Sequence, residues 1–231
     1  MTRNRVPAVV LFDIDGTLLD SGGAGARALG RAFEELLGLR PSFEGVRFDG
    51  ATDPWLVREI SARAGRELDA GTTEALLERY VELLPAELTA ATRYRLLPGV
   101  VATLDALGAA GAPLGLCTGN VVRGARAKLS HGGLWERFPF GGFGSDAEAR
   151  DEIVRAALSR AAGALGRPLA PEEALVVGDT PRDVAAARAA GVPCLAVASG
   201  RHDLAELRAT GAEHAAASLE SPEARRALFG E

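Results

Sequence analysis

Four short apolar runs constrain the fold of this chain more than any other feature. They cover residues 8–13, 113–118, 174–179 and 194–198. Each run is continuous rather than alternating, which is typical of strands buried on both faces of a parallel sheet. Each is followed by a polar or glycine-containing turn and then by a segment of helical composition. This alternation predicts a doubly wound, Rossmann-like α/β fold with a parallel sheet and right-handed crossovers.

The rest of the chain is expected to be mainly helical. Helical composition around the strands covers residues 99–110, 121–130, 150–163, 181–190 and 203–210, with a terminal helix or loose tail over 221–231. One region interrupts the alternation, because residues 20–95 contain no convincing strand and predict helices over 23–38, 54–65 and 72–90. We therefore expect an α/β core domain of residues 1–19 and 96–231, with an inserted α-helical cap domain of residues 20–95.

Charge and composition exclude several classes of function. The formal net charge is −5, so the chain lacks the basic footprint of a nucleic-acid-binding protein. No apolar stretch reaches the ~20 residues needed to span a bilayer, and Met1–Asp15 lacks the length and cleavage site of a signal peptide. We expect a cytoplasmic protein with no membrane partner, either monomer or homodimer. Cys117 and Cys194 lie in apolar runs without metal-ligand spacing, so reduced core cysteines are expected.

The first apolar run ends in Asp13-Ile-Asp15-Gly16-Thr17-Leu18. Two acids at the end of a buried strand are costly unless a partner compensates for them. A divalent cation does so: Asp13 can offer a carboxylate oxygen and Asp15 a backbone carbonyl, both hard ligands suited to Mg²⁺. The ordinary alternative is a solvated turn, since Asp and Gly are common turn residues.

Two further runs end in polar clusters. The second run ends in Thr118 and is followed by Gly119 and Asn120; a hydroxyl and backbone N–H groups at a helix start can hold a phosphate. The alternative there is a helix N-cap. The third run ends in Asp179, and Asp183 lies at the start of the next helix. Both suit metal coordination, although Asp183 is also explained as a first-turn charge favoured by the helix dipole.

Arg150 stands at the start of the predicted helix over 150–163 and offers a cation to a phosphate; the alternative is an exposed arginine on a polar helix. The ordered set of clusters, Asp-x-Asp-Gly-Thr, Thr-Gly-Asn, a basic residue and Gly-Asp-Thr-x-x-Asp, resembles the haloacid dehalogenase-like superfamily. The resemblance covers about residues 8–215. The helical insert resembles the cap of the subgroup that includes phosphoglycolate phosphatase and β-phosphoglucomutase.

The resemblance implies a Mg²⁺-dependent phosphatase that acts on a small phosphorylated metabolite, with a phosphomutase of the β-phosphoglucomutase type as the alternative. It implies that Asp13 is the nucleophile, forming an aspartyl-phosphate, and that Asp15 is the general acid and base. It also implies phosphate-binding residues (Thr118, Gly119, Asn120, Arg150) and metal ligands (Asp13, Asp15, Asp179, Asp183).

The sequence departs from the family pattern at the third motif, which is usually a lysine. Arg150 occupies that place, and a planar guanidinium is not equivalent to a compact ammonium. Lys128, the only lysine of the chain, is the alternative cation, reaching in from the helix after the second motif.

In the insert, the segment Asp49–Asp53 resembles the family's substrate-specificity loop. It gives Gly50, Thr52 and Asp53 as candidate substrate contacts. Arg58 is expected either to meet an anionic group of the substrate or to lie on a solvated helix face.

Overall fold

The structure is a computed structural model, and it describes residues 6–230. The first five residues of the segment assessed above for a signal peptide lie outside this range. The four apolar runs form β1 (Val9–Phe12), β4 (Leu114–Cys117), β6 (Ala174–Gly178) and β7 (Cys194–Val197), as predicted. Within residues 6–230 they belong to a six-stranded parallel sheet in the order β5-β4-β1-β6-β7-β8. The predicted α/β fold class is confirmed.

Two strands of this sheet were not predicted. They are β5 (Phe140–Gly142) and β8 (His214–Ala216), which form the two edges. Neither contains a run of large apolar residues, so neither resembles a buried strand in the sequence. In β5 the glycines have a packing reason, because a Cβ at Gly142 would collide with the backbone of Ile153 in the helix beside it.

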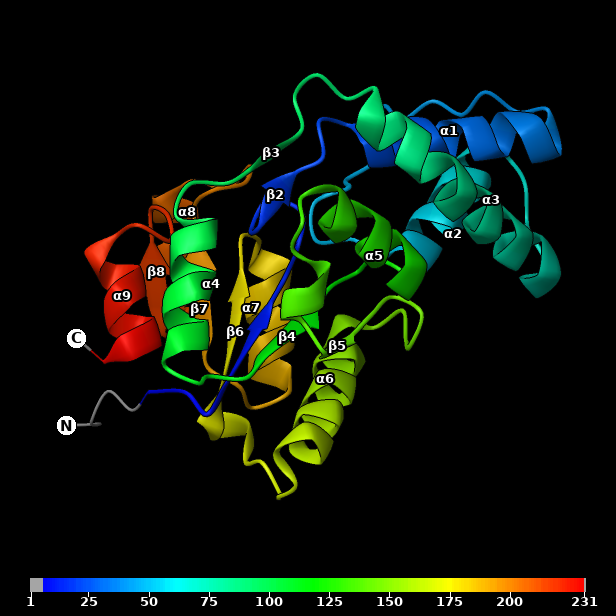
Figure 1. Cartoon of the computed structure of the whole chain (residues 1–231). Helices are drawn as coiled ribbons and strands as arrows, with labels where there is room; N and C mark the ends of the chain where they lie inside the picture. The colour runs from blue at the N-terminus through cyan, green and yellow to red at the C-terminus, as the bar shows by residue number, and fades with distance from the viewer. Residues whose placement is uncertain (1–5, 231) are drawn as a thin grey trace.

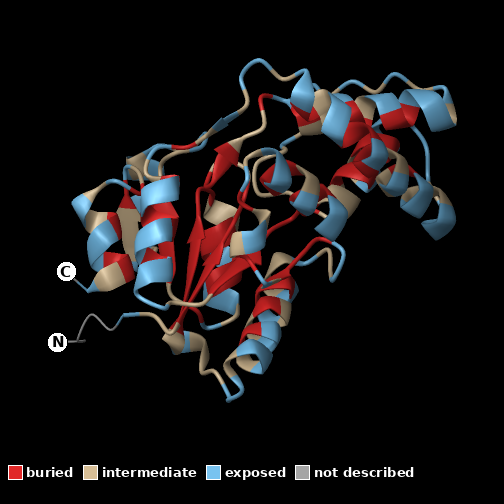
Figure 2. Ribbon diagram, in the orientation of Figure 1, coloured by how far each residue is buried: buried red, intermediate tan, exposed pale blue. Residues whose placement is uncertain are grey.

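Helices cover both faces of the sheet (Figure 1). α4 (Val100–Ala109), α5 (Val122–His131) and α9 (Pro222–Phe229) pack with Val10 and Phe12 of β1. α6 (Arg150–Leu165), α7 (Pro181–Ala189) and α8 (Leu204–Ala209) pack with the alternate residues Val9 and Leu11. Because successive side chains of a strand point to opposite faces, β1 must be apolar at every position. Figure 2 shows the central strands of the sheet buried along their length, and every residue of β1, β4, β6 and β7 is buried.

Residues between β1 and α4 form a separate helical block (Figure 1). It contains α1 (Ala24–Leu37), α2 (Asp53–Arg63) and α3 (Ala70–Thr89), which share a hydrophobic cluster that includes Phe33, Ile60 and Leu84. The chain enters the block through β2 (Leu19–Asp20) and leaves it through β3 (Arg95–Leu96), and these two strands pair antiparallel. This ribbon was not predicted, because two-residue strands carry no periodicity. The division of the chain into two domains remains a prediction.

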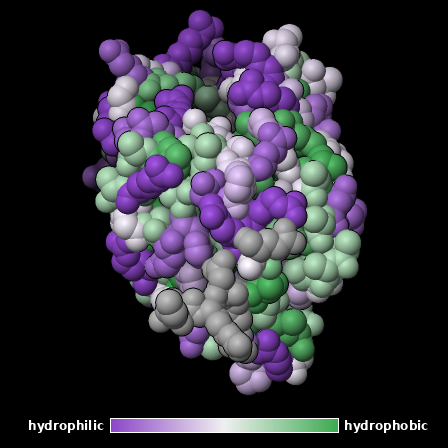
Figure 3. All heavy atoms as spheres, turned by 90° about the vertical axis from the view of Figure 1, so that its left-hand side faces the viewer, coloured by the Kyte–Doolittle hydropathy of each residue, from purple (hydrophilic) through white to green (hydrophobic). Residues whose placement is uncertain are grey.

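Among the described residues, no helix is long and apolar enough to cross a bilayer. Figure 3 views the molecule from the side of α9 and β8. Hydrophilic and hydrophobic residues are interspersed over this face.

Candidate active site

The predicted polar clusters meet at the carboxyl ends of three neighbouring strands. Asp13 follows β1, Thr118 follows β4 and Asp179 follows β6. The order of the sheet reverses at β1, where β4 lies on one side and β6 on the other. Ligands of open α/β sheets bind at such a switch point. A cavity of about 1060 Å³ lies there, between the sheet and the helical block. Its lining includes most of the predicted site residues (Asp13, Asp15, Gly50, Asp53, Thr118, Gly119, Asn120, Arg150 and Asp179).

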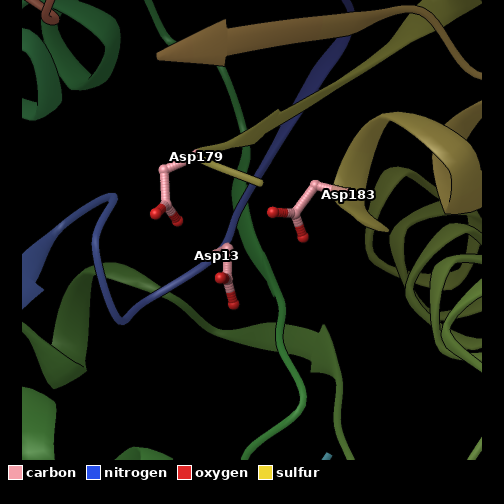
Figure 4. A group of neighbouring side chains, drawn as sticks. All are labelled: Asp13, Asp179 and Asp183. Carbon is pink, nitrogen blue, oxygen red and sulfur yellow. The ribbon is translucent and has the colours of Figure 1, made fainter. Parts of the chain in front are cut away.

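Three acids converge at the base of this site (Figure 4). Asp13, Asp179 and Asp183 each offer a carboxylate oxygen within 4.8 Å of the other two, and all three residues are buried. Burial and the charge of Asp183 raise the pKa of Asp13 to about 7, although Arg150 opposes the shift. Burial and the neighbouring charges of Asp183 and Asp13 raise the pKa of Asp179 to about 9.

The acid cluster fits a divalent cation. Hard carboxylate oxygens at this spacing are the ligands that Mg²⁺ and similar ions use, and a cation offsets the repulsion that raises these pKa values. Asp15, the fourth predicted ligand through its carbonyl, follows Asp13 in the same loop and stays a prediction in this role.

Local structure explains how Asp183 reaches the cluster. It lies in the first turn of α7, where its Oδ2 accepts hydrogen bonds from the Thr180 backbone N–H at 3.0 Å and from the Thr180 hydroxyl at 2.7 Å. This reciprocal capping box fixes the carboxylate next to β6. The two interpretations of Asp183 therefore both apply, since it caps the helix and also lies in the acid cluster.

Gly16 allows the loop after β1 to pass close to Asp179. Its φ of 85° is in the left-handed region, and a Cβ at this position would collide with the Asp179 carboxylate. The next residue, Thr17, donates its hydroxyl to Asp179 Oδ1 at 3.2 Å. The turn at Gly16 and Thr17 thus holds Asp179, which follows β6, close to Asp13, which follows β1.

Arg150 lies beside the nucleophile candidate. Its side chain is 11% exposed, so the alternative of an exposed arginine is wrong. The guanidinium forms an ion pair with Asp183, lies 3.8 Å from Asp13 Oδ1, and donates to the Gly50 carbonyl at 3.3 Å. It is therefore the cation that α6 brings to the acid cluster.

Replacement of Arg150 by methionine is expected to destabilise the metal-free protein. Loss of the guanidinium leaves Asp183 and Asp13 buried without their cation, which costs about 3 kcal/mol of unfolding free energy. Arg155→Met on the same helix is the matched control, because Arg155 is exposed and its surface pair with Asp151 is worth at most about 0.5 kcal/mol. Denaturant unfolding in EDTA measures both changes. Equal stability of the two variants would contradict this role of Arg150.

Lys128 reaches the cavity as well, but it contacts a different acid. Its ammonium donates to Asp15 Oδ2 and to Asn120 Oδ1, both at 2.6 Å. Asn120 in turn donates from Nδ2 to Asp15 Oδ2 and to Thr118 Oγ1, both at 2.9 Å. The two cations that the sequence left as alternatives are thus both present, Arg150 next to Asp13 and Lys128 next to Asp15.

Thr118 is not the N-cap of the following helix, because α5 begins only at Val122. The first N–H groups of this helix are satisfied by side chains from elsewhere. Val121 N–H donates to Asp53 Oδ2 at 2.8 Å, and Val122 N–H donates to Ser145 Oγ at 2.9 Å. Burial raises the pKa of Asp53 to about 6, against the effect of Lys128. Asp53 of α2 therefore joins the helical block to the start of α5.

The other candidates from the insert differ in their placement. Gly50 lines the cavity with a φ of 62°, where a Cβ would meet the side chain of Thr180. Thr52 is the N-cap of α2, accepting from Trp55 N–H at 3.4 Å, and does not line the cavity. Arg58 is also outside the cavity lining; it forms an ion pair with Glu148 and is 64% exposed. Arg58 therefore lies on an exposed helix face, the second of the two placements that the sequence left open, and outside this cavity.

Sequence reasoning missed several residues of the site. Ser199 donates its hydroxyl to the Gly16 carbonyl at 2.8 Å, which holds the loop after β1 against the loop after β7. Tyr80 and arginines from three loops (Arg47, Arg93 and Arg201) also line the cavity. No local motif marks these positions, since only tertiary folding brings them to the cavity.

Comparison with known proteins agrees with this arrangement. Residues 7–191 match the family model described as haloacid dehalogenase-like hydrolase. The phosphoglycolate phosphatase of Rhodospirillum rubrum is 35% identical over 202 residues, covering 84% of this chain and 81% of that protein. The phosphoglycolate phosphatase of Xylella fastidiosa Temecula1 is 33% identical over 202 residues, covering 84% and 82%.

Solved structures share the fold. CbbY from Rhodobacter sphaeroides matches with a TM-score of 0.73 at 22% identity, over 92% of this chain and 95% of that one. A hydrolase from Pseudomonas syringae matches with a TM-score of 0.69 at 23% identity, over 90% and 92%. The family match spans most of the chain and includes each motif that meets at the cavity, so the chain belongs to the haloacid dehalogenase-like hydrolases.

Proposed function

We propose that this enzyme is a Mg²⁺-dependent phosphatase that hydrolyses a small phosphomonoester through an aspartyl-phosphate intermediate. The observation that carries the proposal is the placement of Asp13: it lies in the cavity, next to two further buried acids and a buried arginine. A phosphoryl group there meets a nucleophile, a cation and the elements of a metal site in one place. Relatives named phosphoglycolate phosphatase support the same class of reaction.

The chemistry of each residue follows from its position. An Asp13 carboxylate oxygen attacks phosphorus while the bond from phosphorus to the leaving-group oxygen breaks, and Asp15 gives that oxygen a proton. Asp15 then takes a proton from the water that hydrolyses the aspartyl-phosphate, which restores Asp13. Arg150 and the polar groups of Thr118 to Asn120 hold phosphate oxygens. A cation bound by the acid cluster supplies charge that keeps Asp13 ionised and offsets the negative charge of the phosphoryl group.

A second negative charge on the substrate fits the cavity. Arg47, Arg93 and Arg201 line it and have no side-chain hydrogen bond or ion pair within residues 6–230. Phosphoglycolate carries a carboxylate beside its phosphate and is the substrate in the name of the relatives. We therefore propose a small phosphorylated acid as the preferred substrate.

We propose that the helical block acts as a lid over this cavity. The helical block is hydrogen-bonded directly to the loop after β4: Asp53 N–H donates to the Gly119 carbonyl at 2.8 Å. A Cβ at Gly119 would collide with the Ala51 carbonyl. We expect Gly119→Ala to hold the block away from the sheet and to lower kcat/KM by roughly 10²-fold, because closure excludes water and completes the site. Gly108→Ala, where a Cβ meets no atom, is the control in steady-state kinetics. Equal kinetics of both variants would contradict the lid.

Phosphate release from a panel of small phosphomonoesters tests the proposed function. The panel contains phosphoglycolate, nucleoside monophosphates and hexose phosphates, each with Mg²⁺. We expect free phosphate from several compounds, with phosphoglycolate among the best. A rearranged hexose phosphate without free phosphate identifies a mutase instead. No product from any compound, with folded protein, would contradict a phosphatase.

A further inference from the structure

Lys128 occupies a position that the proposed mechanism does not explain. It is the only lysine in the chain, and it is 5% exposed. A buried ammonium is costly unless it is paired and hydrogen-bonded. Two acceptors meet this need, because Lys128 Nζ donates hydrogen bonds to Asp15 Oδ2 and to Asn120 Oδ1.

The contacts of Lys128 leave the two oxygens of Asp15 in different states. Oδ2 accepts from both Lys128 Nζ at 2.6 Å and Asn120 Nδ2 at 2.9 Å. Oδ1 has no hydrogen-bond partner among residues 6–230. The Asp15 side chain is 40% exposed and lines the cavity. The carboxylate is therefore held by one oxygen, and its other oxygen is available to a ligand.

The helical block and the linker after it help to hold Lys128 itself. Its backbone carbonyl accepts a hydrogen bond from the Tyr94 hydroxyl at 3.0 Å. Burial alone lowers the pKa of Lys128, but the nearby groups Asp15, Tyr80 and Asp53 outweigh it, so the pKa lies above its usual value. A Cβ at Gly25 of α1 would lie 3.7 Å from both Lys128 Nζ and the Tyr80 hydroxyl oxygen, so the ammonium lies between the helical block and Asp15.

Lys128 does not duplicate Arg150. Arg150 contacts Asp13, Asp183 and the Gly50 carbonyl, whereas the Lys128 ammonium contacts Asp15 and Asn120. The two cations therefore serve different acids.

We propose that Lys128 is a positioning residue for Asp15, holding its carboxylate so that the free oxygen meets the leaving-group oxygen of the substrate. This inference rests on the proposed function of Asp15 as general acid and base. Proton transfer requires hydrogen-bond reach, and a misplacement of about 1 Å costs roughly 10²-fold in rate. Without the ammonium, Asn120 Nδ2 is the one described donor left on Oδ2, and the Asp15 side chain is freer to turn away from the substrate.

The leaving group of the substrate provides the test. An alkyl phosphate such as phosphoglycolate needs a proton on its leaving oxygen, whereas the phenolate of para-nitrophenyl phosphate departs without one. We expect Lys128→Met to lower kcat/KM roughly 10²-fold for the alkyl phosphate and by less than about 3-fold for the aryl phosphate. The kcat for the aryl phosphate should fall with its KM, because Asp15 still has to activate the hydrolytic water.

Arg126→Met is the matched control, since Arg126 is an exposed residue on the same helix, and should leave both substrates unaffected. An equal loss of kcat/KM for both substrates in Lys128→Met would overturn the positioning role, because loss of phosphate binding or of the fold affects both alike. An unchanged kcat/KM for the alkyl phosphate would also overturn it. In both cases, phosphate release by the wild-type enzyme would still support the proposed function. A wild-type enzyme inactive on both substrates would overturn the proposed function, and the positioning role with it.

A second measurement keeps the ion pair testable if Lys128→Met does not fold. Because the chain has a single lysine, lysine labelled at Cε with a stable carbon isotope gives one NMR signal for this side chain. We expect a signal distinct from that of free lysine, which moves in Asp15→Asn. A signal at the free-lysine position, unchanged in Asp15→Asn, would overturn the inference.

Discussion

Asp13→Asn is expected to lower kcat by about 10⁵-fold or more, because an amide cannot attack phosphorus and no other step replaces the nucleophile. Asparagine has nearly the same shape, so phosphate binding and the fold should persist. The measurement is phosphate release under saturating substrate, with protein of matched purity. A kcat within tenfold of the wild type would contradict a nucleophilic role.

The stability of this variant provides an internal control. The pKa of Asp13 is about 7 in the folded protein against an ordinary value of 3.8, so its ionised form destabilises the fold at neutral pH and above. Replacing it by asparagine removes that charge from the acid cluster. The metal-free variant should therefore melt no lower than the metal-free wild type, and a folded but inactive protein is the expected result.

Removal of the metal should have the second-largest effect. EDTA is expected to lower kcat by about 10³-fold or more, and added Mg²⁺ to restore it, because the buried acids otherwise repel both each other and the phosphoryl group. Asp179→Asn should lose most of this response, since it removes one of the clustered carboxylates. Activity that is unchanged by EDTA after dialysis would contradict a metal-dependent site.

Thermal melting measures metal binding in the absence of substrate turnover. A cation that binds only the folded protein stabilises it by about 2.7 kcal/mol at a concentration 100 times Kd. Mg²⁺ should therefore raise the Tm of the wild type clearly and that of Asp179→Asn much less. Asp105→Asn is the matched control, because Asp105 is an exposed acid of α4 paired with Arg137. It should respond to Mg²⁺ as the wild type does.

Local sequence was sufficient to predict the features that depend on a few neighbouring residues. The four central strands are continuous apolar runs, and the polar residues that follow Phe12, Cys117 and Gly178 had to meet at one edge of a parallel sheet. The convergence of Asp13, Asp179 and Asp183 follows directly from that geometry. The edge strands were missed because glycine and alanine in short segments carry no strand signal.

Features that depend on tertiary packing were not predictable in the same way. Asp53 caps α5 from another helix, which a sequence motif cannot show because the two segments are far apart in the chain. The pairing of Lys128 with Asp15 depends on how α5 packs beside the loop after β1. Arg58 carries the positive charge that would suit an anionic substrate. In the structure it forms an ion pair with Glu148, from the loop before α6, instead. Long side chains at the surface can reach several partners, and only the fold selects one.

The covalent intermediate is the most direct test of the proposed mechanism. Asp15→Asn, which slows hydrolysis of an aspartyl-phosphate, should be mixed with Mg²⁺ and para-nitrophenyl phosphate, whose leaving group departs without a proton, then quenched in acid and digested for mass spectrometry. We expect one phosphoryl group on the peptide that contains Asp13, and none when Asp13→Asn is added to the same protein. Phosphate release by the wild type with no phosphoryl group on that peptide at any quench time would contradict Asp13 as the nucleophile.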